Sequence, residues 1–150
     1  MDTEQPSDIP TILTNDTANY RSSLPLLPKD DYTLKVKEVK YTTSEKGSKL
    51  VKIQLTTCED HYDVTGKELI KAGFPIFDQI SLTETENYPE LNIQRRLKQF
   101  RMAATGEKAG SFFPLQQYSG CTVKATLKVQ EAKDGFDERN AIARYITPKE

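Results

Sequence analysis

The stretch DYTLKVKEVKY, residues 31–41, alternates apolar and polar side chains like a β-strand, but the alternation changes phase halfway along. Its apolar residues stand first at even and then at odd positions: Tyr32, Leu34 and Val36, followed by Val39 and Tyr41. A β-bulge inserts one residue into a strand, reverses the alternation beyond it and bends the strand. We therefore predict a bent strand with a bulge at Lys37–Glu38.

Four further strands and one helix are predicted after this bent strand. The strands cover residues 49–57, 74–83, 121–129 and 139–146, the helix covers residues 89–105, and a short helical turn covers residues 111–118. Strand 49–57 alternates cleanly, as expected for a half-buried strand. In the helix, an apolar stripe recurs at helical spacing and is formed by Ile93, Leu97, Phe100 and Ala104.

The order of these elements is three strands, a helix and two strands. A small five-stranded sheet buries its apolar face when it curls, and curling requires one strand that is long and bent enough to belong to both halves. We therefore predict a mainly β fold, a five-stranded OB-fold-like Greek-key barrel. Its helix, between the third and fourth strands, would plug the open end. The alternative is a flat antiparallel sheet with the helix on one face.

Composition divides the chain into two regions. Residues 1–28 carry four acidic side chains and one basic side chain, whereas residues 29–150 carry 20 basic and 18 acidic side chains. We predict a flexible acidic leader over residues 1–28 and one OB-fold domain over residues 29–150. The start MDTEQPSD lacks the pattern of a signal peptide, no apolar run is long enough to span a bilayer, and two cysteines make no disulfide framework. These features predict a soluble cytoplasmic protein without membrane contact.

Basic residues gather on the predicted outer face of the first two strands. Residues 35–52 contain six lysines and two glutamates. If the apolar residues of these strands face inward, several lysines and one aromatic ring of the third strand share the outer face: Lys35, Lys37, Lys40, Lys52 and Phe77. Ammonium groups can follow the phosphates of a nucleic acid while an exposed ring stacks on unpaired bases.

Two loops are expected to complete this surface. Tyr62 and Lys67 belong to the long connection between the second and third strands, which could close over a bound strand. Phe136 and Arg139 belong to the last hairpin, which OB-folds also use for ligands. An alternative interpretation stays open, because lysines on solvent faces also discourage edge pairing. An outward Phe77 is harder to explain in this way, but the leader or the partner in a homodimer could cover it.

Several short motifs resemble those of a known family. They are LPKDDYTLKVKEVKY, SEKGSKLVKIQLTT, FDQISLT, RRLKQFRMAA, SGCTVKATLKV and RNAIARYI. Together they resemble a family of phage-encoded OB-fold proteins that includes single-stranded-DNA-binding proteins of phage replication modules. The residues that match the family pattern are Leu27, Pro28, Tyr32, Lys46, Gly47, Gly120, Val123, Asn140, Ile142, Arg144 and Tyr145. The resemblance covers residues 24–147. It implies binding of single-stranded DNA during phage DNA replication or recombination, without catalysis and with phage replication or recombination proteins as partners.

Enzymatic and metal-dependent functions find little support in the sequence. The one histidine, His61, lies in EDHYD, whose spacing matches neither a zinc site nor an EF-hand loop. Cys58 and Cys121 are isolated, and no histidine obviously pairs with either of them as the base for a nucleophile. We expect no catalytic residues, no metal and no cofactor. Two functions remain: a non-catalytic binder of single-stranded DNA, and an interaction or structural module that docks another protein through Phe77 and the leader.

Overall fold

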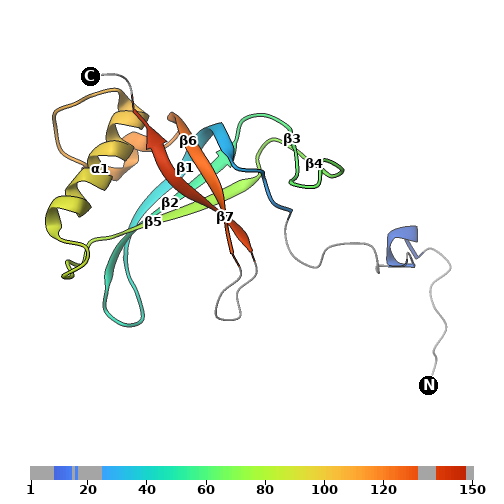
Figure 1. The fold of residues 1–150 in the computed structure, drawn as a ribbon, viewed down its shortest axis with the longest axis horizontal. Coiled ribbons are helices and arrows are strands. Elements are labelled where there is room, and N and C mark those ends of the chain that lie inside the picture. Colours follow the sequence, from blue (N-terminus) through green and yellow to red (C-terminus); the bar gives the residue numbers. More distant parts are fainter. Residues whose placement is uncertain (1–8, 15, 17–24, 132–137, 148–150) are drawn as a thin grey trace.

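A computed structural model of the chain describes residues 9–14, 16, 25–131 and 138–147 (Figure 1). Its strands are β1 (Asp30–Thr43), β2 (Lys49–Thr57), β3 (His61–Tyr62), β4 (Leu69–Ile70), β5 (Pro75–Ser81), β6 (Thr122–Gln130) and β7 (Arg139–Ile146). Its helices are α1 (Glu90–Thr105) and the short 3-10 helices η1 (Thr11–Leu13) and η2 (Leu115–Tyr118). The five predicted strands and the predicted helix are confirmed. The β3–β4 hairpin was not predicted, because strands of two residues show no alternation.

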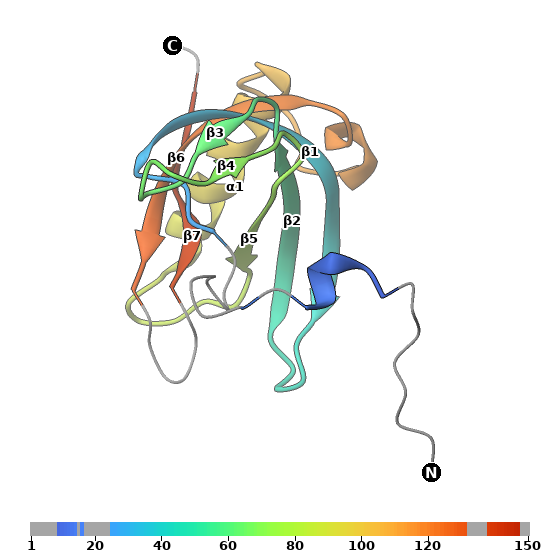
Figure 2. The ribbon, with the colours of Figure 1, turned by 90° about the vertical axis from the view of Figure 1, so that its right-hand side faces the viewer.

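Five strands form one antiparallel sheet in the order β5-β2-β1-β6-β7. The bent strand β1 belongs to both halves of this sheet, because its first half pairs with β6 and its second half with β2. Figure 2 shows β1 arching between the β6–β7 side and the β2–β5 side. The predicted bulge is confirmed, since the register passes from Val36–Leu55 to Glu38–Gln54 and leaves Lys37 without a partner in β2.

The bulge keeps apolar residues inward on both sides of the bend. Val36 and Val39 are both buried although they are three residues apart, an odd spacing that a regular strand would place on opposite faces. Tyr41, which has the same phase as Val39, is 47% exposed. The inward face of β1 therefore ends at Val39, and the last residues of the strand extend past the core.

The two edge strands, β5 and β7, approach each other without pairing. The hydroxyl of Tyr145 in β7 donates a hydrogen bond to Asp78 in β5 at 2.7 Å. Across the part of the chain that the structure describes, no backbone ladder joins these strands, so the sheet is not closed into a barrel. Closure into an OB-fold barrel stays a prediction.

Helix α1 follows β5 in the chain and lies at one end of the sheet, with the β3–β4 hairpin at the other (Figure 1). Its apolar stripe packs inward through Ile93 and Phe100. The Phe100 ring makes edge contacts with Tyr118 and Tyr145, each at 5.1 Å between ring centroids. The helix thus joins the core. That it plugs the open end of a barrel stays a prediction.

The segment before β1 is fixed along β7. The side chain of Asn140 accepts a hydrogen bond from the backbone N–H of Leu27 and donates one to its carbonyl, both at 2.8 Å. The hydroxyl of Tyr32 donates to the carbonyl of Pro28 at 2.6 Å. Leu26 and Leu27 are buried, although both lie within the predicted leader. Of the leader before residue 25, only residues 9–14 and 16 are described.

Candidate nucleic-acid interface

The outer face of β1, β2 and β5 carries two rows of side chains that cross the sheet. In one row Gln54 of β2 lies between Glu38 of β1 and Phe77 of β5. In the next row Lys52 lies between Lys40 and Gln79. The bulge creates this alignment, because the residue that it inserts brings the even-numbered residues Glu38 and Lys40 to the outer face. Without the bulge, both side chains would point into the core.

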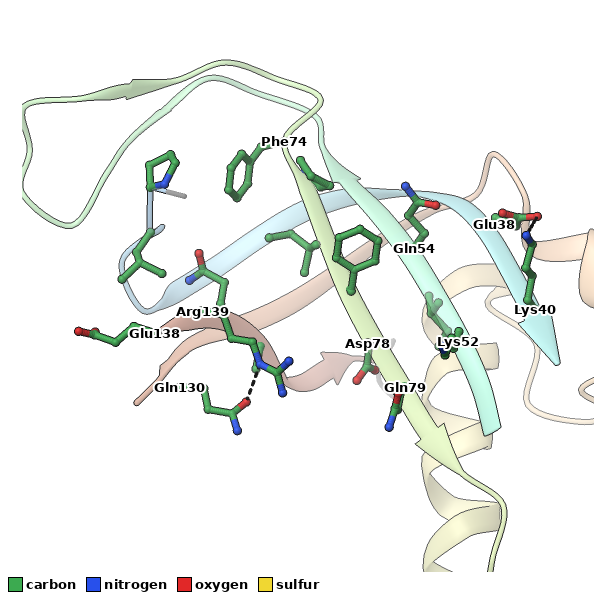
Figure 3. Close-up of a pocket in the computed structure, with 18 residues that line it drawn as sticks. Glu38, Lys40, Lys52, Gln54, Phe74, Asp78, Gln79, Gln130, Glu138 and Arg139 are labelled. Carbon is green, nitrogen blue, oxygen red and sulfur yellow. Dashed lines mark hydrogen bonds and ion pairs between the residues drawn. The ribbon is translucent and has the colours of Figure 1, made fainter. Parts of the chain in front are cut away.

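A hollow of about 950 Å³ lies over these rows (Figure 3). In Figure 3, Lys40 and Glu38 lie on one side of it, Gln54 and Lys52 near the middle, and Arg139 and Gln130 on the other side. We call this hollow the groove. Its volume is within the range of sites that enclose small organic ligands, which is about 300–1,000 Å³. The groove is therefore large enough for a nucleotide base and its sugar.

Phe77 is the exposed aromatic residue in the groove. The strand places it outward because its neighbour Ile76, like Ile80, is buried in the core. The Phe77 ring is 63% exposed, whereas Phe74, the residue before β5, is partly buried against the core. The predicted outward orientation of Phe77 is confirmed. An exposed ring beside cationic side chains is suited to stack on a base whose phosphates the cations contact.

The described lining of the groove contains three cationic and three anionic side chains: Lys40, Lys52 and Arg139, and Glu38, Asp78 and Glu138. Lys40 is paired at 3.4 Å with Glu38, but both side chains are about half exposed or more. Arg139 donates a hydrogen bond to the amide oxygen of Gln130 at 3.4 Å. Neither Arg139 nor Lys52 has an ion pair with any residue that the structure describes. Lys40 and Lys52 lie directly opposite each other, and like charges in this arrangement destabilise a sheet.

One carboxylate at the edge of the groove, Asp78, is already neutralised from the core side. Arg96 of α1 donates to both of its oxygens, at 3.0 and 3.3 Å, and Tyr145 donates to one of them. The Arg96 guanidinium also lies 5.6 Å from the centre of the Tyr145 ring. Burial raises the pKa of Tyr145 well above 10, and the charge of Asp78 raises this pKa further. The Tyr145 hydroxyl therefore stays protonated and keeps its hydrogen bond to Asp78.

The Asp78–Arg96–Tyr145 cluster was not predicted, although the sequence contained a signal for it. In FPIFDQI the carboxylate occupies the same strand face as Ile76 and Ile80, which is the core face. A charge on a core face requires a partner. The sequence did not identify the partner of Asp78, because Arg96 follows 18 residues later on a different element.

The structure brings together four of the nine predicted binding residues. Lys40, Lys52, Phe77 and Arg139 line the groove. Lys35 and Lys37 are exposed on β1 beyond the groove, and Lys35 lies opposite Thr56. Tyr62 and Lys67 are exposed in the β3–β4 hairpin, and no residue of this hairpin is among the described residues that line the groove. Phe136 lies outside the described residues.

Comparisons with known proteins add no assignment. No protein-family model matches the chain, and no curated protein matches it in sequence. Within the described residues, no group of three or more His, Cys, Asp or Glu side chains is placed to hold a metal ion. No helix in the same part of the chain is both long enough and apolar enough to cross a bilayer.

Proposed function

We propose that this protein binds single-stranded DNA in the groove, without catalysis, as an OB-fold protein of phage DNA replication or recombination. The observation that carries the proposal is Phe77, a 63% exposed ring on the sheet face with Lys52 and Arg139 in the same hollow. A ring on the outer face of a strand gains nothing from the core. It gains about 1–3 kcal/mol when an unpaired base stacks on it.

The strand order supports the OB-fold part of the proposal. In an OB-fold, the first strand is shared by two halves of a Greek-key barrel and ligands bind across the second and third strands. Here β1 pairs with both β2 and β6, and the groove crosses β2 and β5, the second and third strands of the five-stranded sheet. Arg139 begins β7, so it stands at the last hairpin, where OB-folds place a second set of ligand contacts.

Titration of the purified protein into a labelled oligo-dT tests the proposal. An oligonucleotide of about 30 nucleotides exceeds the site of one OB domain, which spans about 4–16 nucleotides. We expect tight binding at low salt, weaker binding at moderate salt, and a preference for the single strand over a matched duplex. Absence of binding at low salt would overturn the proposal, because phosphate contacts are strongest under that condition.

Docking of another protein is a second candidate function, and the β3–β4 hairpin favours it. Tyr62, Val64 and Leu69 of this hairpin are 60%, 44% and 42% exposed. Exposed apolar side chains that lie close together are common at protein interfaces. Salt separates the two functions, because neutralisation of phosphates releases counterions and makes DNA binding steeply salt-dependent, whereas apolar docking does not.

A further inference from the structure

A second hollow, of about 300 Å³, lies between α1 and β7. Its lining consists of Tyr88, Asn92, Arg95, Arg96, Gln99, Ala143 and Arg144. We call it the arginine hollow. The described residues of its lining include three guanidinium groups, two carboxamides and a phenol, but no carboxylate. Hydrogen-bond donors therefore predominate, which is the composition expected of a site for an anion.

Two local features of the chain build this hollow. Asn92, Arg96 and Gln99 are spaced by four and three residues, so they share one face of α1. On β7 the register passes from Leu127–Ile142 to Thr126–Arg144, which leaves Ala143 as an extra residue. This second bulge exposes Ala143 and Arg144 in succession, whereas a regular strand would turn one of them inward.

Two of the three guanidinium groups in the hollow are available to a ligand. Arg96 is engaged with Asp78 at 3.0 Å. Among the described residues, Arg95 has a single long side-chain hydrogen bond, to Asn92, and Arg144 has one to the hydroxyl of Thr126, both at 3.4 Å. Neither Arg95 nor Arg144 forms an ion pair with any residue in the described part of the chain. Arginine is well suited to phosphate because its planar fork can donate two parallel hydrogen bonds.

The groove and the arginine hollow adjoin at the open edge of the sheet. Asp78 lines the groove, and its partner Arg96 lines the hollow. Along β7, Ala141 lines the groove and Ala143 lines the hollow. In Figure 1, β7 and β5 both run toward the side of the sheet where α1 lies. A chain that leaves the groove along these strands would reach Arg95 and Arg144.

We propose that the arginine hollow binds a backbone phosphate of the same single strand after it leaves the groove, through Arg95 and Arg144. This inference rests on the proposed function. On this path the DNA crosses the β5–β7 edge above the Asp78–Arg96 pair, in which Arg96 neutralises the carboxylate of Asp78. The groove binds bases by stacking, and the arginine hollow adds a phosphate contact that does not depend on base identity.

Oligonucleotide length tests the inference. Arg95→Gln and Arg144→Gln are each compared with Lys108→Gln, which removes one exposed cation from the loop after α1 and lines neither hollow. Affinity is measured for oligo-dT of about 5 and about 15 nucleotides, at the two ends of the range of OB-domain sites. Thermal unfolding verifies that each variant is folded.

We expect both arginine variants to bind the short oligonucleotide like the wild type and the long one several-fold more weakly. Their salt slope on the long oligonucleotide should fall by about 0.7 for each phosphate that is no longer neutralised. Unchanged affinity and salt slope on the long oligonucleotide would overturn the inference. If Phe77→Ala still weakens binding in that case, the proposed function stands. If the wild type binds neither oligonucleotide, the proposed function fails as well.

Discussion

Phe77 and Asp78 are neighbours in β5, and the strand places them in opposite environments. The apolar ring of Phe77 is 63% exposed, whereas the carboxylate side chain of Asp78 is only 10% exposed. This arrangement inverts the usual distribution of apolar and charged residues. Three hydrogen bonds from Arg96 and Tyr145 compensate for the burial of the Asp78 charge. No comparable contact among the described residues compensates for the exposure of the Phe77 ring. We infer that Asp78 serves the fold and Phe77 serves a ligand.

Removal of the buried carboxylate should have the largest effect on stability. Asp78→Ala leaves the Arg96 guanidinium, 23% exposed, without its partner. Breaking a buried pair costs about 3–5 kcal/mol, and the partial exposure of Arg96 puts the expected loss near the lower end, about 3 kcal/mol. Urea unfolding at neutral pH measures it. Gln79→Ala, at the next and exposed position, is the control and should change stability by less than about 0.5 kcal/mol.

An equal loss of stability in Asp78→Ala and Gln79→Ala would contradict the structural role of Asp78. Asp78→Asn refines the comparison, because the amide oxygen still accepts a hydrogen bond from Tyr145 while the charge facing Arg96 is gone. A variant of intermediate stability would show that charge and hydrogen bonding both contribute.

Removal of the exposed ring should have the largest effect on binding. Phe77→Ala is expected to weaken binding to single-stranded DNA by about 1–3 kcal/mol, the value of one stacked base, and to change stability little. Duplex DNA should be affected less, because its bases are already stacked. The matched control is Tyr62→Ala in the β3–β4 hairpin, which removes a ring of nearly equal exposure, 60%, that does not line the groove.

The control also decides between the two candidate functions. If Tyr62→Ala weakens DNA binding as much as Phe77→Ala, the hairpin closes over the strand, as the sequence predicted. If neither variant changes DNA affinity, stacking in the groove is excluded and protein docking becomes the better explanation for the exposed rings.

The Tyr145 hydroxyl should make a smaller contribution, visible at high pH. Tyr145→Phe removes one hydrogen bond to Asp78 and should cost about 1 kcal/mol at neutral pH. Burial raises the pKa of Tyr145 well above 10 and that of Tyr118 to about 12. In the unfolded chain both phenols ionise near pH 10. Their contribution is therefore complete below about pH 10 and is lost as the pH rises through the folded pKa values.

Urea midpoints at about pH 8 and about pH 11 measure this loss. Between these two pH values the free energy of unfolding should fall further in the wild type than in Tyr145→Phe. The decrease that Tyr145→Phe still shows includes the contribution of Tyr118. Identical losses in the two proteins would mean that the Tyr145 hydroxyl is not held in its protonated form by the fold.

The sequence predicted the parts of this molecule that depend on local alternation. Each of these parts follows from the positions of the apolar residues within a single strand. They are the bulge at Lys37, the strands themselves and the outward orientation of Phe77. The partner of Asp78 and the limits of the groove depend on how the sheet curls, which brings β5, β7 and α1 together. No local pattern encodes that approach. Three residues of the motifs, Leu27, Tyr32 and Tyr145, are buried in the core, and Asn140 forms two hydrogen bonds with the backbone of Leu27.

The smallest expected effect distinguishes the groove from the longer lysine strip that the sequence predicted. Lys52 lies in the groove and has no ion pair among the described residues, whereas Lys35 is exposed on β1 beyond it. Lys52→Gln should lower the slope of log affinity against log salt by about 0.7, the value for one phosphate contact to a single strand. Lys35→Gln should leave the slope unchanged, and salt titrations of both variants measure this difference. An equal decrease would mean that the strand runs along β1 past the bulge, so that Lys35 and Lys37 contact phosphates outside the groove.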